Sequence, residues 1–176
     1  MKTTFAKAAL AGTAMTAAIV MGAGSASAAV VVGPAGSAGT GTPTADYQVC
    51  GTAYVGADTH VGAPPADAKA VGGVKITGQL YDLLNSLKAT YTTTTASDGT
   101  WCLQGDEAMA NTVTWGGKVK MSFDTPTVGT YTGKMSGGTS APGTDASINS
   151  LEFLSHGYPT ATTSAKSAWK VNVVYQ

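Results

Sequence analysis

The sequence predicts an all-β protein that is tied by one disulfide and begins with a flexible arm. Two observations support this fold class. Short runs of β-branched and aromatic residues alternate with polar residues and are separated by glycine, proline and aspartate turns. Charged residues make up only 11% of the chain, whereas glycine and threonine are abundant, which is typical of weakly charged extracellular β proteins.

The stretch that organises the chain is Thr90 to Leu103, a threonine-rich run followed by Asp98-Gly99 and then by Trp101-Cys102-Leu103. An Asp-Gly pair adopts the positive φ angles of a tight hairpin turn, and threonine suits a half-solvated strand. The pattern therefore predicts a β-hairpin whose second strand carries a cysteine.

Residues 1–28 have the pattern of a secretory signal peptide. Lys2 and Lys7 precede a small, apolar middle, and Ala26-Ser27-Ala28 supplies an A-x-A cleavage site. We expect cleavage after Ala28 and a secreted, extracellular protein. The apolar middle is too short for a membrane span of ~20 residues, and no later segment approaches that length, so we expect no membrane span.

The charge balance argues against nucleic acid as a partner. Without residues 1–28 the chain keeps 8 lysines against 10 acidic residues, a formal charge of −2, and it contains no arginine. A basic field that attracts nucleic acid is absent, as is the residue best suited to bidentate phosphate contacts. The expected partner is an extracellular protein or polysaccharide.

Cys50 and Cys102 are the only cysteines, and export would place them in an oxidising compartment. We predict that they form a disulfide, which on the chain-entropy model stabilises the fold by roughly 4 kcal/mol. Redox or metal chemistry would require a CxxC pair or neighbouring histidines, and the sequence has neither. No cofactor is expected.

Residues 29–45 are rich in glycine, alanine, proline and threonine, which favours a flexible arm. The alternative is that Val30-Val31-Val32 adds a strand to this sheet or to that of a neighbouring molecule. Tyr47–Val55 is the first predicted strand, with Cys50 facing away from the valines. A long loop, residues 56–73, separates it from the alternating strand Val74–Leu80.

Leucines at positions 80, 83, 84 and 87 have helical spacing, but the segment is short enough to be a turn, or a strand with an irregular step, instead. Asn111–Phe123 would form a hairpin with a loop longer than Gly116-Gly117, or no hairpin at all. Leu151–Leu154 is predicted as a short strand. The alternating run from Trp169 to Tyr175 predicts a terminal strand inside the sheet, so that its truncation should be costly.

The segment Cys50 to Phe123 resembles the prealbumin-like, or transthyretin-like, β-sandwich of carboxypeptidase regulatory-like and collagen-adhesin B-type domains. The residues that carry the resemblance are Cys50–Val55, Val71–Thr77 and Thr92–Trp101. The resemblance implies an antiparallel Greek-key sandwich of about seven strands over residues 46–176. It also implies a stalk, accessory or binding module without active-site residues of its own.

No residue pattern points to catalysis or metal binding. His60 and His156 are far apart in sequence, and the neighbours Ser155 and His156 form no triad by adjacency. Asp106-Glu107 is the sole adjacent acid pair and is predicted to be a solvated turn. The remaining aspartates form no D-x-D-x-D-G calcium loop.

Trp101, Trp115 and Trp169 allow two interpretations. Exposed together, they would form a stacking platform for sugar rings; in a small sandwich, inward-facing tryptophans are mostly core, and we favour the core for each. The sequence thus predicts a monomeric, non-enzymatic, secreted binding or cell-surface accessory module. The alternatives are a carbohydrate-binding module that uses exposed aromatics, and a small hydrolase or hydrolase inhibitor.

Overall fold

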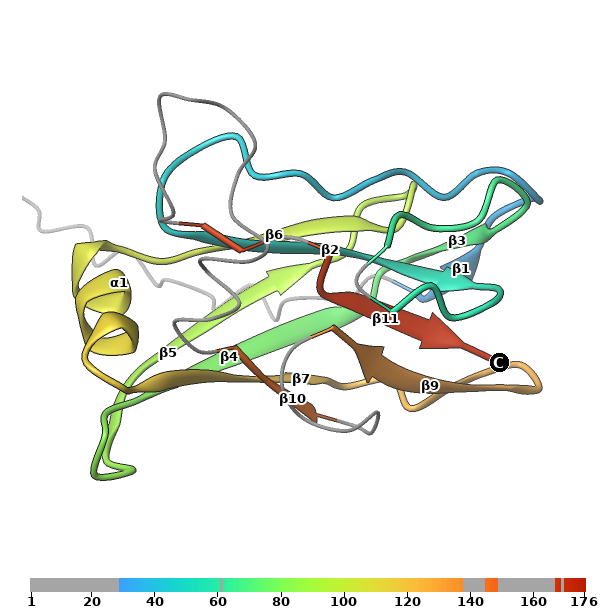
Figure 1. Ribbon diagram of the computed structural model, residues 1–176. Coiled ribbons are helices and arrows are strands. Elements are labelled where there is room, and N and C mark those ends of the chain that lie inside the picture. The colour runs from blue at the N-terminus through green and yellow to red at the C-terminus, as the bar shows by residue number, and fades with distance from the viewer. Residues whose placement is uncertain (1–28, 61, 138–144, 149–166, 169) are drawn as a thin grey trace, which may run out of the picture.

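The computed structural model describes residues 29–60, 62–137, 145–148, 167–168 and 170–176 (Figure 1). The predicted signal peptide and the predicted strand Leu151–Leu154 lie outside the described residues. His156 and Trp169 also lie outside them.

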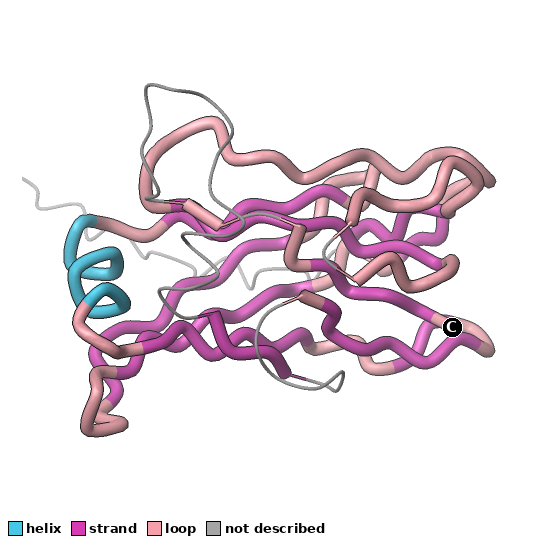
Figure 2. The backbone as a smooth tube through the Cα atoms, viewed as in Figure 1, coloured by secondary structure: helices cyan, strands magenta, loops and turns pink. Residues whose placement is uncertain are grey.

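The described chain is mostly β-strand, in two sheets that face each other and form a nearly closed, barrel-like wall (Figures 1 and 2). The first sheet has the order β1-β3-β2-β11-β9-β8, with β6 also paired to β2. Its strands are β1 (Val31–Val32), β2 (Gln48–Val55), β3 (Lys69–Gly72), β6 (Thr100–Gln104), β8 (Thr127–Val128), β9 (Tyr131–Ser136) and β11 (Asn172–Tyr175).

The second sheet has the order β10-β7-β4-β5 and is antiparallel throughout. Its strands are β4 (Lys75–Tyr81), β5 (Leu87–Thr94), β7 (Lys118–Phe123) and β10 (Asp145–Ile148). A helix, α1 (Glu107–Thr114), connects β6 to β7 at one end of the molecule (Figure 1). The predicted β-rich class is therefore confirmed.

The core lies between the two sheets and is built by strands with a period of two. Ile76 and Leu80 of β4, preceded by Val74, are buried, whereas Lys75 is exposed and Gln79 is half-buried, as the alternation predicts. The larger side chains that share this core are Val49, Trp101, Leu103, Met109, Val119, Met121, Met135, Val173 and Tyr175.

Strand β2 is buried on both faces, because residues 33–45 cover its outer face. The prediction that this arm is flexible is therefore wrong. Residues 33–45 run along the outer face of β2, where the Gly41 N–H donates to Thr52 Oγ1 at 3.0 Å and Thr52 Oγ1 donates to the Gly39 carbonyl. A side chain at Gly41 would overlap the backbone of Gly51, so a glycine permits this close approach.

The valines at the start of the arm extend the chain's own sheet. Val31 lies opposite Gly72 and Val32 opposite Val71, so that β1 pairs antiparallel with β3. The alternative in which the valines add a strand to this sheet is confirmed. β3 itself occupies the end of the predicted loop 56–73. It pairs with Tyr54 and Val55, the part of β2 that β6 does not reach, and so satisfies the backbone hydrogen bonds there.

The predicted hairpin over Thr90–Leu103 is wrong, although its turn is present. The Gly99 N–H donates to the Ala96 carbonyl, and Gly99 has a φ of 78°. The strands on either side then part: β5 pairs with β4 in the second sheet, and β6 pairs with β2 in the first. The turn therefore carries the chain from one sheet to the other.

The segment Leu80–Leu87 contains a turn and not a helix: β4 ends at Tyr81, residues 82–86 form the turn, and β5 begins at Leu87. Asp82 Oδ1 accepts hydrogen bonds from the N–H groups of Leu84 at 2.9 Å and Ser86 at 2.8 Å, and Asn85 has a φ of 59°. This side-chain capping of the backbone competes with helix formation and closes the β4–β5 hairpin. The turn alternative is confirmed.

The helix forms instead at α1, where the sequence favoured a turn followed by a strand. Asp106 caps it by accepting the Met109 N–H at 2.9 Å, and Met109 and Val113, four residues apart, are buried. Because residues up to Thr114 are helical, Asn111–Phe123 forms no hairpin, which was the second of the two alternatives.

The C-terminal strand β11 lies inside the first sheet, as predicted. It pairs parallel with β2 and antiparallel with β9. The Tyr175 hydroxyl donates to the Thr125 carbonyl at 2.8 Å, and its ring packs edge-on against Phe123. Among the described residues, α1 is far too short to cross a membrane, and no described helix is long and apolar enough to do so.

Asp58 fastens the β2–β3 connection to β9. Its Oδ1 accepts hydrogen bonds from the Ser136 hydroxyl at 2.6 Å and from the His60 N–H at 2.7 Å, and Lys134 Nζ lies 3.3 Å from Oδ2. Partial burial raises the pKa of this carboxyl, but the hydrogen bonds from Ser136, His60 and Lys134 together hold the pKa below its usual range.

We expect the Asp58→Asn variant to lose about 1 kcal/mol of unfolding free energy near pH 7, because it loses charge-assisted hydrogen bonds. Because the folded-state pKa lies below the unfolded-state pKa, the ionised carboxylate stabilises the protein above about pH 4. This stabilisation is lost as the pH falls through the folded-state pKa. Urea unfolding near pH 7 and near pH 3 should therefore show a difference from the parent that shrinks in acid.

The exposed acid Asp67 of the same connection provides the control, because Asp67→Asn should leave stability unchanged at either pH. A deficit of Asp58→Asn that is the same at both pH values would contradict a contribution from the ionised carboxylate.

Candidate functional site

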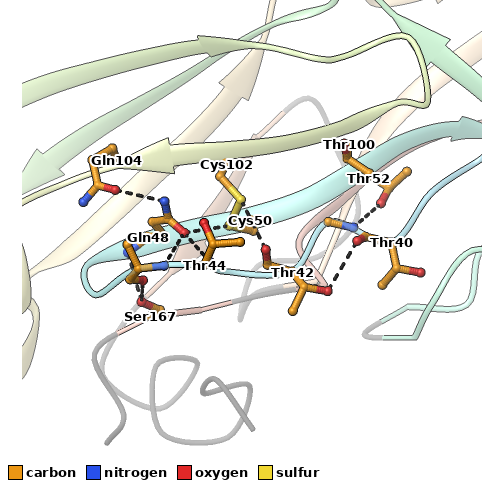
Figure 3. The surroundings of a disulfide bond; sticks show 12 residues. Thr40, Thr42, Thr44, Gln48, Cys50, Thr52, Thr100, Cys102, Gln104 and Ser167 are labelled. Carbon is orange, nitrogen blue, oxygen red and sulfur yellow. Dashed lines mark hydrogen bonds between the residues drawn. A yellow bond between two sulfur atoms is a disulfide. The ribbon is translucent and has the colours of Figure 1, made fainter. Parts of the chain in front are cut away.

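The disulfide joins two neighbouring, paired strands. Cys50 of β2 lies directly opposite Cys102 of β6, with their Cα atoms 4.1 Å apart, and the predicted disulfide is thereby confirmed (Figure 3). Both sulfurs lie on the outer face of β2, the face that residues 33–45 cover. The Thr42 carbonyl lies 3.7 Å from Cys102 Sγ.

Gln48 holds the arm in place beside the disulfide (Figure 3). Its Oε1 accepts the N–H groups of Thr44 at 2.8 Å and Ala45 at 3.2 Å, while its Nε2 donates to Gln104 Oε1 at 2.9 Å. Its backbone N–H donates to the Ser167 hydroxyl. These bonds fix the position of the arm relative to β2 and β6.

A cavity of about 510 Å³ lies where the arm, the end of β5 and the start of β6 meet. We call it the threonine cleft, because six of the side chains that line it are threonines. Its lining consists of Thr40, Gly41, Thr42, Thr44, Thr93, Thr94, Asp98, Thr100, Trp101 and Cys102.

Two of the six hydroxyls are engaged within the protein. Thr42 Oγ1 donates to the Thr40 carbonyl at 3.3 Å, and Thr100 Oγ1 donates to Asp98 Oδ1 at 2.7 Å. The other four have no hydrogen-bond partner in the part of the chain that the structure describes. They belong to Thr40, Thr44, Thr93 and Thr94.

The electrostatic character of the cleft is close to neutral. Asp98 contributes a carboxylate, which the N–H and the hydroxyl of Thr100 already bind at 3.0 and 2.7 Å. The described lining contains neither lysine nor histidine. A cleft of this composition suits an uncharged ligand that donates and accepts hydrogen bonds, and each threonine adds a methyl group for apolar contact.

The structure separates the three tryptophans. Trp101 is 3% exposed and packs in the core, so the core interpretation is confirmed for it, and no face of its ring is open for stacking. Its Nε1 has no hydrogen-bond partner among the described residues. Trp115 is 79% exposed, so the core interpretation is wrong for this residue. Trp169 lies outside the described residues.

The other candidate residues lie apart from the threonine cleft. His60 is exposed on the β2–β3 connection. Asp106 caps α1 and accepts the Tyr91 hydroxyl at 3.3 Å; burial and this carboxylate raise the pKa of Tyr91. Asp106 was predicted to lie in a solvated turn; in the structure it is instead the N-cap residue of α1. Within the described ranges, no three metal-ligating side chains come together.

Sequence reasoning missed the threonines of the cleft. Thr40, Thr42 and Thr44 recur at every second residue of the arm, and Thr93 and Thr94 belong to the run that was interpreted only as a strand. In the arm, a threonine hydroxyl recurs at every second residue, the spacing of side chains on one face of an extended chain. This spacing indicates an ordered, polar surface in a segment that was otherwise interpreted as flexible.

Searches with this chain found no matching family model, no matching curated protein and no matching solved structure.

Proposed function

We propose that this chain is a non-enzymatic, extracellular binding module that holds a neutral, hydroxyl-rich ligand, such as a segment of polysaccharide, in the threonine cleft. The observation that carries the proposal is a set of four threonine hydroxyls around one cavity of about 510 Å³, none of which has a hydrogen-bond partner among the residues that the structure describes. Such groups are free to exchange bound water for ligand hydroxyls.

The chemistry of the lining supports a carbohydrate over a charged ligand. A sugar ring presents hydroxyls together with C–H surface, and threonine offers a hydroxyl and a methyl group within one short side chain. A phosphate or carboxylate would meet the Asp98 carboxylate and no cation among the described lining residues, which disfavours an anion.

Several features favour a binding module over a hydrolase. The Asp98 carboxylate is held within its own turn by Thr100, and His60 is on a connection that does not line the cleft. A general acid or base has to reach the substrate with a free, suitably tuned group. The disulfide and the signal-peptide pattern of residues 1–28 support an extracellular location.

We also propose that the fold is a variant of the prealbumin-like Greek-key sandwich. Two facing sheets and the strands that contain Cys50–Val55 and Lys75–Thr77 support this relationship. The helix α1 and the crossing between sheets after Thr94 would be departures from it. The pairing of β1 with the chain's own β3 supports a monomer, because the valines are already engaged.

Retention on insoluble polysaccharides tests the proposal. We expect the chain from Ala29 to be retained by at least one neutral polysaccharide. Replacing three cleft hydroxyls in Thr40→Val/Thr93→Val/Thr94→Val should weaken binding at least about tenfold, because each lost hydrogen bond is worth roughly 0.5–1.5 kcal/mol. Valine keeps the shape of threonine, so the fold should survive.

The matched control is Thr90→Val/Thr92→Val, which changes exposed threonines of β5 that do not line the cleft. This variant should bind as the parent does. Absence of retention by any neutral polysaccharide, or equal losses in the two variants, would contradict the proposal.

A further inference from the structure

A second surface lies at the end of the molecule that carries α1 and the β4–β5 turn (Figure 1). Four large apolar side chains are exposed there: Leu83 at 69%, Leu84 at 82%, Leu87 at 52% and Trp115 at 79%. We call this set the apolar tip. Among the described residues, the one other large apolar side chain so exposed is Val31, in β1 at the opposite end (Figure 1).

The apolar tip is continuous, although it comes from two separate connections. A Cβ placed on Gly116 would lie 3.2 Å from Leu83 Cδ1, so the leucine of the β4–β5 turn packs against the residue that follows Trp115. Lys118, at the start of β7, lies opposite Tyr81 at the end of β4, which brings the two connections to the same edge. Exposed apolar groups that gather in this way mark an interaction surface.

The turn that carries the leucines is held firmly. Asp82 binds two backbone N–H groups of the turn and lies 2.9 Å from Lys88 Nζ. The carboxylate of the tip is therefore compensated within the turn. Lys118 has no ion-pair partner in the described part of the chain, so its ammonium group can interact with an anion outside the protein.

The size and shape of the tip decide between possible partners. A stable protein interface buries about 800 Å² and roughly 20 residues on each side, far more than four side chains at two loop ends provide. The threonine cleft has its lining elsewhere, and no tip residue contributes to it. A bilayer needs no complementary surface: leucine and tryptophan partition into its interface, and lysines beside them reach the headgroups.

We propose that the apolar tip inserts reversibly into the surface of a bilayer that contains anionic phospholipid. Leu83, Leu84 and Leu87 enter the boundary between headgroups and acyl chains, and Trp115 lies at the same depth with its indole N–H toward the headgroups. Lys118 supplies the attraction to anionic lipid. The opposite end of the molecule stays in water.

Sedimentation with vesicles tests this inference on the chain from Ala29, which lacks the apolar leader that would itself bind lipid. We use vesicles of phosphatidylcholine alone and of phosphatidylcholine mixed with phosphatidylglycerol. The parent should bind the mixed vesicles, and Leu84→Ser/Trp115→Ser should lower its partition coefficient at least about tenfold. Lys118→Gln should lower it about fivefold on mixed vesicles and leave binding to neutral vesicles unchanged.

Val31→Ser is the matched control, because it removes an exposed apolar side chain from the other end of the molecule and should leave vesicle binding unchanged. All variants should keep the parental thermal midpoint, since Val31, Leu84 and Trp115 are exposed and Lys118 is half-buried without an ion-pair partner among the described residues. Failure of the parent to bind mixed vesicles, or an equal loss in Val31→Ser, overturns the inference. A parental dimer that Leu84→Ser/Trp115→Ser converts to a monomer also overturns it, because the tip would then bind a second copy.

Discussion

Ending the chain at Val171, and so removing β11, should prevent the protein from folding. β11 lies between β2 and β9, and its deletion leaves both with unpaired backbone groups in the middle of a sheet. Val173, Val174 and Tyr175 are completely buried, and burial of each such side chain is worth roughly 1.5–3 kcal/mol. Together with the lost ladder, this reaches the 5–15 kcal/mol that typically stabilises a domain.

Circular dichroism and thermal unfolding measure this effect. We expect the truncated chain to show no cooperative transition. The single substitution Val173→Ala should retain a transition but lower the unfolding free energy by about 2 kcal/mol, because it leaves a cavity while the ladder persists. A truncated chain that unfolds cooperatively near the parental midpoint would show that β11 is not integral to the sheet.

Removing the disulfide with Cys50→Ala/Cys102→Ala should lower the unfolding free energy by about 4 kcal/mol. The bond closes a loop between residues 52 positions apart, and the chain-entropy model gives a stabilisation of roughly this size for such a loop. Urea unfolding of the parent with and without a reductant should reproduce the difference between the parent and the variant.

The effect should also reach the threonine cleft, since Cys102 lines it and the arm packs beside the disulfide. Thiols that react quantitatively in the native, oxidised protein would contradict the presence of the bond. A variant as stable as the parent would show that the bond adds nothing to the fold.

Alternation of apolar and polar residues was sufficient to predict β4, which buries one face and leaves the other exposed or half-buried. The alternation in the sequence also predicted β2 and β11 as strands, although both are buried throughout in the structure. The pairing of Cys50 with Cys102 followed from their number. The assignment of strands to sheets did not follow, because the turn at Asp98-Gly99 has the same local chemistry whether it closes a hairpin or joins two sheets.

The errors elsewhere arise from competition between local signals and tertiary packing. The leucines of residues 80–87 have helical spacing, but Asp82 binds the backbone of its own turn, and a segment this short gains little from helix formation. Residues 29–45 have the composition of a flexible arm. They are ordered because they pack on the outer face of β2 and form hydrogen bonds with Thr52 and Gln48 of that strand.

The threonine cleft was invisible to sequence analysis for a further reason. Its lining comes from three segments: the arm, the end of β5 and the start of β6. The arm was interpreted as flexible, so its threonines could not be placed beside those of β5 and β6 from the sequence alone.

The most direct test of the binding proposal is an amide chemical-shift map of the ¹⁵N-labelled chain during titration with soluble fragments of the polysaccharide that retains it. The proposal predicts that the largest shifts occur in residues 40–44, 93–94 and 98–102, and that they saturate. Saturable shifts centred instead on Trp115, on His60 or on the far end of the molecule, with these three segments unaffected, would contradict it.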